Sequence, residues 1–172
     1  FKLSPFACRV LILDGYLEDD AFKTLVENSD YVVNASHGEG QCLPLMEGMS
    51  AGKPAISPDH TGMADYIRLE NAFIVGSSVE PAYWPHDPRE RLRALQYRID
   101  WQSLCTAFRR SYRLTKEHPD AYRNMSLRAY ETMKQHCSCK TVLRRLKPFL
   151  ESRQREHQAF DRCWQPSIVK SR

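Results

Sequence analysis

Two glutamates, Glu39 and Glu47, lie near each other in the chain, with a turn and a proline between them. Ionised carboxylates accept hydrogen bonds and donate none, so the pair suits the hydroxyl groups of a polyol. Pro44 favours the first turn of a helix, where its missing N–H costs nothing. Glu47 then follows on the same face, one turn later. Because the start of a helix attracts anions, these residues predict a site for a ligand that combines an anionic group, such as a diphosphate, with the hydroxyl groups of a polyol.

The elements around the two glutamates are expected to place them at the edge of a sheet. Residues 31–35 form a short apolar run typical of a buried strand, and this run leads into the first glutamate. Ligands of open α/β sheets bind at the carboxyl ends of the strands. Gly38 and Gly40 let the backbone approach a ligand closely, and Gly52 predicts the end of the helix. The order is therefore strand, ligand-binding loop, helix and next strand.

Residues 36–54 closely resemble the donor-site signature of group-one glycosyltransferases, the large retaining family often numbered four. Four positions depart from the family's pattern: Gln41 replaces an aromatic residue, Cys42 a glycine, and Gly48 and Ser50 alanines. The resemblance extends over residues 9–76 and is looser to about residue 150. The matching residues are Glu39, Gly40, Leu43, Pro44, Glu47, Met49, Gly52, Pro54 and Ile56.

The resemblance implies a role for each residue of a nucleotide-sugar site. Glu39 would be the catalytic residue, facing the donor sugar and stabilising positive charge that develops at its anomeric carbon. Glu47 would hold the ribose hydroxyls. The backbone between the glutamates would contact the sugar and phosphate, and two residues after the first expected strand would contact the base, unless they only pack the loop. These further substrate-binding residues are Gly40, Gln41, Cys42, Leu43, Tyr16 and Leu17.

The implied reaction transfers a sugar from a nucleotide-diphosphate sugar to a glycan or lipid-linked acceptor, with retention of configuration. Relatives usually act without a metal or another cofactor, and the chain has no Asp-x-Asp metal motif. The helix N-terminus would stabilise the charge that grows on the leaving diphosphate. Two alternatives remain open. One is a sugar-nucleotide epimerase-like domain of the same architecture, and the other is a truncated or degenerate domain that binds a nucleotide or a partner without catalysis.

Alternating strands and helices predict an α/β fold, with a Rossmann-like parallel sheet, helices on both faces and a helical C-terminal part. Residues 1–150 are expected to form a partial nucleotide-sugar-binding domain, and residues 151–172 a C-terminal helix and tail. The resemblance implies the C-terminal half of a GT-B enzyme, inactive without the missing N-terminal domain. Apolar spacing and strand-like composition predict a strand at 9–13 and helices at 17–28, 101–116, 121–135 and 141–150, the last continued by 151–157.

Charge is unevenly distributed behind the net value of +4. Residues 1–88 contain 5 Lys and Arg against 13 Asp and Glu, whereas residues 89–172 contain 20 against 8. A basic half favours an anionic membrane surface, and the alternative is a solvated helical surface. No nucleic-acid motif accompanies the charge, so nucleic acid is not an expected partner.

The six cysteines follow no recognisable disulfide framework, which favours a reducing cytoplasm. Cys137 and Cys139 form a lone Cys-x-Cys without the second ligand pair that zinc sites usually show, so no metal is expected. The chain contains no apolar run long enough to span a membrane and no visible signal peptide. The expected location is therefore the cytoplasm, with peripheral contact at the cytoplasmic membrane face.

Overall fold

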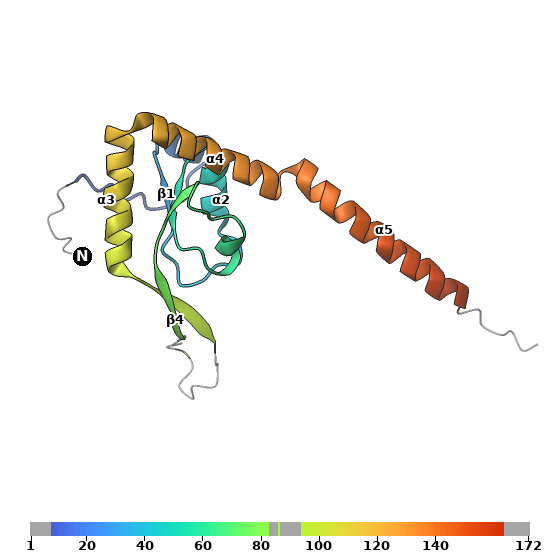
Figure 1. Ribbon diagram of the computed structural model, residues 1–172. Coiled ribbons are helices and arrows are strands. Elements are labelled where there is room, and N and C mark those ends of the chain that lie inside the picture. The colour runs from blue at the N-terminus through green and yellow to red at the C-terminus, as the bar shows by residue number, and fades with distance from the viewer. Residues whose placement is uncertain (1–7, 83–85, 87–93, 164–172) are drawn as a thin grey trace, which may run out of the picture.

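Short strands alternate with helices in the first part of the chain, and long helices make up the last part (Figure 1). The computed structural model describes residues 8–82, 86 and 94–163, with side chains as far as Arg153. The elements are α1 (Asp19–Glu27), β1 (Val32–Val33), α2 (Leu43–Ser50), β2 (Ala55–Ser57), the 3-10 helix η1 (Thr61–Asp65), β3 (Ala72–Ile74), β4 (Ser77–Pro81), β5 (Leu95–Ile99), α3 (Trp101–Glu117), α4 (Pro119–Cys137) and α5 (Cys139–Cys163).

Three of the strands form a parallel sheet in the order β1-β2-β3. Side chains alternate between the two faces of a strand. Ala55 and Ala72 therefore join the core cluster built by α2, η1 and α4. Their neighbours Ile56 and Phe73 join the cluster on the opposite face, which α3 covers. The structure confirms the predicted α/β fold, with a parallel sheet and helices on both faces.

Helix α2 ends as its glycine predicts. Gly52 takes a left-handed conformation with φ 76°, which glycine adopts without strain. The N–H groups of Gly52 and Lys53 donate to the carbonyls of Met49 and Gly48 at 3.0 Å, and this paired arrangement satisfies the last turn of the helix. At Gly48 the helix approaches β1 so closely that an added Cβ would collide with the side chain of Val32. The departure from alanine at this position therefore has a packing reason.

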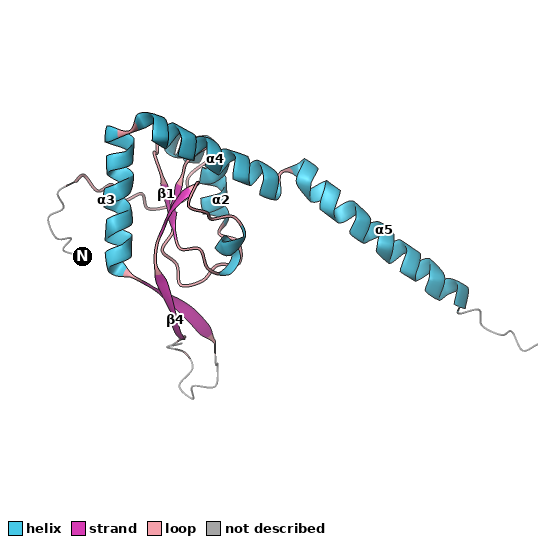
Figure 2. Ribbon diagram, in the orientation of Figure 1, coloured by secondary structure: helices cyan, strands magenta, loops and turns pink. Residues whose placement is uncertain are grey.

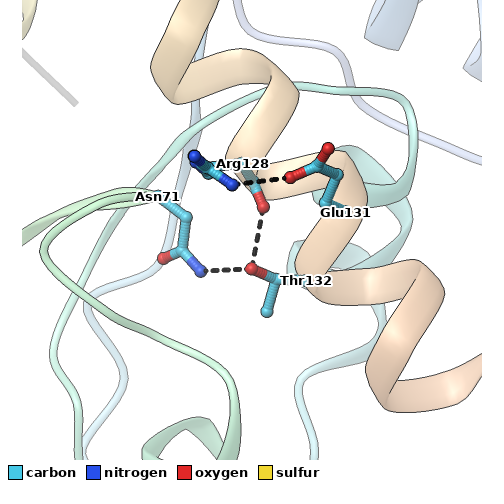
Figure 3. A network of polar contacts seen from close by, with 4 residues as sticks. All are labelled: Asn71, Arg128, Glu131 and Thr132. Atoms are coloured by element: carbon cyan, nitrogen blue, oxygen red, sulfur yellow. Dashed lines mark hydrogen bonds and ion pairs between the residues drawn. The ribbon is translucent and has the colours of Figure 1, made fainter.

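A buried polar network joins α4 to the start of β3. The Asn71 amide donates to the carbonyl of Tyr66 at 2.9 Å and to Thr132 Oγ1 at 3.1 Å, and its oxygen accepts from the Arg68 N–H at 2.9 Å. Figure 3 shows how Thr132 continues the network by donating to the carbonyl of Arg128 at 2.7 Å. The network fixes the position of α4 over the sheet.

Strands β4 and β5 form a separate antiparallel hairpin, in which Ser77 pairs with Ile99 and Val79 pairs with Tyr97. Figure 2 shows the hairpin projecting beyond the parallel sheet, below the start of α3. The hairpin leads into α3, whose first turn is capped by Asp100: its Oδ1 accepts from the N–H of Ser103 at 2.9 Å. The hairpin therefore begins and ends next to the carboxyl end of β3.

The three C-terminal helices confirm the predictions from apolar spacing, with ends that differ by a few residues. Helix α5 begins before the predicted residue 141 and continues beyond residue 157. It extends away from the rest of the molecule, next to the end of α4 (Figure 1). The predicted tail beyond Cys163 lies outside the described residues. Among the helices that the structure describes, none is long and apolar enough to cross a membrane.

The predicted strand at residues 9–13 is wrong. This segment has no regular structure, and Val10 and Ile12 are 48% and 70% exposed. A strand needs a partner for its backbone groups, and in the described part of the chain no strand pairs with this segment. The predicted strand at 31–35 is correct in place but shorter, and the predicted helix at 17–28 is observed as α1.

Candidate functional site

The loop that carries Glu39 lies at the carboxyl end of β1 and is held by η1. We call residues 36–42 the Glu39 loop. The backbone N–H of Glu39 donates to Thr61 Oγ1 at 3.1 Å, and the Glu39 carbonyl accepts from the N–H of Gly62 at 3.1 Å. A Cβ added at Gly62 would collide with the carbonyl group of Gly40. Both backbone groups of Glu39 are thus fixed by an element that follows the neighbouring strand.

A buried tyrosine holds the other end of the Glu39 loop. The Tyr66 hydroxyl donates to the carbonyl of Gln41 at 2.6 Å. Burial, together with the nearby Cys42 and Glu39, raises the pKa of Tyr66, so the hydroxyl keeps its proton and remains a donor. The loop conformation is therefore set by hydrogen bonds from η1 and from the residue that follows it.

Cys42 forms the turn between the loop and α2. Its backbone is left-handed, with φ 57° and ψ 69°, a conformation that costs an L-residue about 1–2 kcal/mol relative to the right-handed one. This geometry explains why glycine suits the position. The Cys42 carbonyl accepts from the N–H groups of Leu45 and Met46 at 3.1 Å and so starts the helix. Burial raises the pKa of the Cys42 thiol, which disfavours the reactive thiolate.

Backbone donors at this turn are left without acceptors. In residues 8–82, 86 and 94–163, the N–H groups of Gly40, Gln41, Cys42 and Leu43 donate a hydrogen bond to no acceptor. The start of α2 also carries the positive end of the helix dipole. The turn therefore presents several donors and a partial positive charge to an anion.

A cavity of about 730 Å³ opens beside these donors, between α1 on one side and β1 and α2 on the other. This volume lies in the range that binds small molecules and cofactors. Of the described lining residues, Glu39 is the one that carries a carboxylate. The wall from α1 is mostly apolar. The lining consists of Phe22, Leu25, Val26, Ser29, Val32, Val33, Asn34, Glu39, Gln41, Cys42, Leu43, Pro44 and Leu45.

The structure brings half of the predicted site residues to this cavity. Those that line it are Glu39, Gln41, Cys42 and Leu43.

The other predicted residues lie around it. Gly40 belongs to the same loop but does not line the cavity, and Glu47 is exposed on the next turn of α2, outside the lining. Tyr16 is 83% exposed and Leu17 is half-buried, and both precede α1 without lining the cavity.

His60 lies next to Thr61, the residue that accepts from the backbone N–H of Glu39. It is 5% exposed, and its ring stacks on Tyr97 of β5 with centroids 4.1 Å apart and an interplanar angle of 16°. Its Nδ1 is 3.3 Å from Thr61 Oγ1, and its Nε2 has no hydrogen-bond partner among the described residues. Burial lowers the pKa of His60, so the imidazole is neutral at pH 7.

Sequence reasoning missed three residues that hold the Glu39 loop, namely Thr61, Tyr66 and Tyr97. Thr61 and Tyr66 lie more than 20 residues along the chain from the loop atoms that they bond, and Tyr97 lies still further away. No local pattern marks such contacts. For Thr61 the order of elements gave one indication. Its turn follows β2, the neighbour of β1, so both turns lie at the carboxyl edge of the parallel sheet.

In the part of the chain that the structure describes, no three or more His, Cys, Asp or Glu side chains gather closely enough to hold a metal ion. The chemistry that the described site offers is that of one carboxylate, several backbone donors and an apolar wall.

Comparison with known proteins gives one match. Residues 10–85 match the family model described as glycosyl transferases group 1. The matched segment contains α1, the Glu39 loop, α2 and all three strands of the parallel sheet. No curated protein and no solved structure matches the chain. This part of the chain is therefore similar to a group-one glycosyltransferase domain, and the similarity supports glycosyl transfer as the chemistry.

Proposed function

We propose that the cavity between α1 and α2 binds a nucleotide-diphosphate sugar, and that the chain is the donor-binding domain of a retaining glycosyltransferase. One observation carries the proposal. Glu39 lines the same cavity as the turn whose N–H groups lack acceptors. A carboxylate beside an anion-binding helix start suits a ligand that has sugar hydroxyls next to a diphosphate.

Each part of the donor has a place in this proposal. The diphosphate would accept hydrogen bonds from the N–H groups of Gln41, Cys42 and Leu43 and face the positive end of α2. Glu39 would contact the sugar. Glu47, exposed on the next turn of α2, would bind the ribose at the outer rim, and Tyr16 and Leu17 would contact the base. Fixed donors cost no reorganisation when negative charge grows on the leaving diphosphate, so the turn would stabilise that transition state.

Glu39 would stabilise positive charge at the anomeric carbon as the bond to the diphosphate breaks. The sugar would be transferred with retention of configuration to a glycan or lipid-linked acceptor, and no metal is required. The acceptor site would lie on a further N-terminal domain of a GT-B enzyme, and without that domain the chain would bind donor but not turn it over. The basic residues of the C-terminal half would favour contact with the cytoplasmic face of a membrane.

Ligand-observed NMR of the 172-residue chain tests this function. UDP, GDP, ADP and their common sugar conjugates are compared for binding to the wild type and to Glu39→Gln and Glu47→Ala. One nucleotide class is expected to bind. Loss of a charge-assisted hydrogen bond of about 1.5 kcal/mol or more then weakens binding roughly tenfold.

The two variants are expected to differ. Glu47→Ala weakens the bare nucleotide and its sugar conjugate alike, whereas Glu39→Gln weakens only the conjugate. Glu70→Gln is the matched control, because Glu70 is exposed next to the start of β3, at the opposite edge of the sheet. The proposal fails if none of the nucleotides binds, or if the two variants bind as the wild type does.

A further inference from the structure

The β4–β5 hairpin touches the Glu39 loop directly. The backbone N–H of Tyr97 on β5 donates to the carbonyl of His37 at 2.9 Å. Because Tyr97 pairs with Val79 on one edge of its strand, this bond uses its other edge. The hairpin thus adds a backbone contact at His37 to a loop that η1 already holds at Glu39.

The side chain of Tyr97 reaches the same loop by a second route. Its ring lies flat on the ring of His60, and His60 Nδ1 is 3.3 Å from Thr61 Oγ1. That hydroxyl oxygen is the acceptor for the backbone N–H of Glu39. A short chain of contacts therefore runs from the hairpin through His60 and Thr61 to Glu39.

The unpartnered nitrogen of His60 shows what the ring does in this chain. Nε2 is buried and bonds to no group in the described residues, so no hydrogen bond to Nε2 orients the ring from that side. It acts instead as a neutral, flat surface between Tyr97 and Thr61. Such a ring is held in place by packing, and the stacked tyrosine supplies that packing on the hairpin side.

We propose that Tyr97 is a positioning residue for Glu39, and that the β4–β5 hairpin stabilises the Glu39 loop in the conformation that contacts the donor sugar. The part that concerns the sugar rests on the proposed function, whereas the ordering of the loop does not. In that scheme the bare nucleotide contacts α2 and the end of the loop that Tyr66 holds at Gln41, whereas the sugar contacts Glu39. Loosening of the loop near Glu39 should therefore affect the sugar conjugate more than the nucleotide.

The first test needs no ligand. Amide hydrogen exchange is measured by NMR for Glu39 and Gly62 in the wild type, Tyr97→Ala and Tyr97→Phe. An aromatic pair contributes about 0.5–1.5 kcal/mol, so Tyr97→Ala should speed exchange at both amides roughly two- to tenfold. Tyr97→Phe keeps the ring and should restore wild-type exchange. The amide of Val75, which bonds to the Ser57 carbonyl at 3.0 Å, reports whether the sheet is intact.

A matched control and a second variant keep the test decisive. Leu95→Ala truncates a side chain that is 72% exposed on the same strand and should leave both loop amides unchanged. Tyr97→Leu replaces the ring by an apolar chain if Tyr97→Ala proves too unstable, and should also speed exchange. Unchanged exchange at Glu39 and Gly62 in both Tyr97→Ala and Tyr97→Leu would overturn the proposal.

The second test uses the nucleotide and conjugate that the wild type binds. Tyr97→Ala should weaken the conjugate roughly two- to tenfold and the bare nucleotide clearly less, a difference that general destabilisation does not produce. Equal weakening of both ligands would overturn the role toward the sugar. If loop exchange responds but the wild type binds no nucleotide, the proposed function is wrong and the positioning of the loop stands.

Discussion

Gly62→Ala is the change for which the structure gives the clearest expected cost. The added Cβ would collide with the backbone carbonyl of Gly40. Because this group is part of the backbone, the collision can be relieved only by a shift of the loop itself. Overpacking of this kind costs about 1–3 kcal/mol. Loss of the Gly62 hydrogen bond to the Glu39 carbonyl adds about 0.5–1.5 kcal/mol, and the stiffer unfolded chain returns about 0.4–1 kcal/mol. The net expectation is a free energy of unfolding lower by about 2 kcal/mol.

Thermal and urea unfolding followed by circular dichroism measure this change. For a chain of 172 residues, 2 kcal/mol corresponds to a fall in Tm of roughly 4–8 °C. Gly40→Ala is the matched control, because a Cβ there meets no atom within 4 Å. It should leave stability unchanged or raise it by up to about 1 kcal/mol. If Gly62→Ala unfolds at the same temperature as Gly40→Ala or above it, the close approach of η1 to the Glu39 loop is refuted.

Two further changes test the buried polar groups. Burial lowers the pKa of His60 below its usual 6.5, against the opposing effect of Asp59, so the unfolded chain binds the proton first. The free energy of unfolding should therefore fall as the pH drops below about 6.5, by at most about 1.4 kcal/mol per pH unit. His60→Phe should remove this part of the pH dependence when urea unfolding is measured at pH 5–7.5. If the free energies of unfolding of variant and wild type change with pH in the same way, the prediction is contradicted. Asn71→Ala breaks three hydrogen bonds and should lower the free energy of unfolding, measured in urea, by about 3 kcal/mol. Arg128→Ala removes the exposed ion pair in Figure 3 and should lower it by less than about 1 kcal/mol. Similar losses in the two variants would show that Asn71 does not hold the network.

The sequence predicted those features that local chemistry decides. Gly52 marks the end of α2 because a left-handed backbone there requires a residue such as glycine. Apolar spacing located α3 and α4, since each of these helices buries part of one face. It also located the start of α5, although Val142, Leu143 and Leu146 are exposed there. The position of Glu39 next to the start of α2 also follows, because loop and helix are adjacent in the chain.

Features that depend on distant partners were not predictable. Residues 9–13 have the composition of a strand, but composition does not supply a neighbouring strand. The roles of Thr61 and Tyr97 come from contacts with a loop that is far away in the chain. Glu47 shows a third limit: its spacing from Pro44 places it one turn further along α2, yet the cavity opens toward α1 and does not include it.

The two walls of the cavity differ in how firmly they are held, and this has a thermodynamic consequence. Helix α2 contributes buried residues such as Leu45 and Met46 to the core, whereas α1 has no buried residue. A ligand that draws α1 inward would remove the apolar faces of Phe22 and Leu25 from water. Its binding would then carry a negative heat-capacity change that calorimetry at several temperatures detects. A ligand that rests on the α2 wall alone would bury less apolar surface and bind with a smaller heat-capacity change.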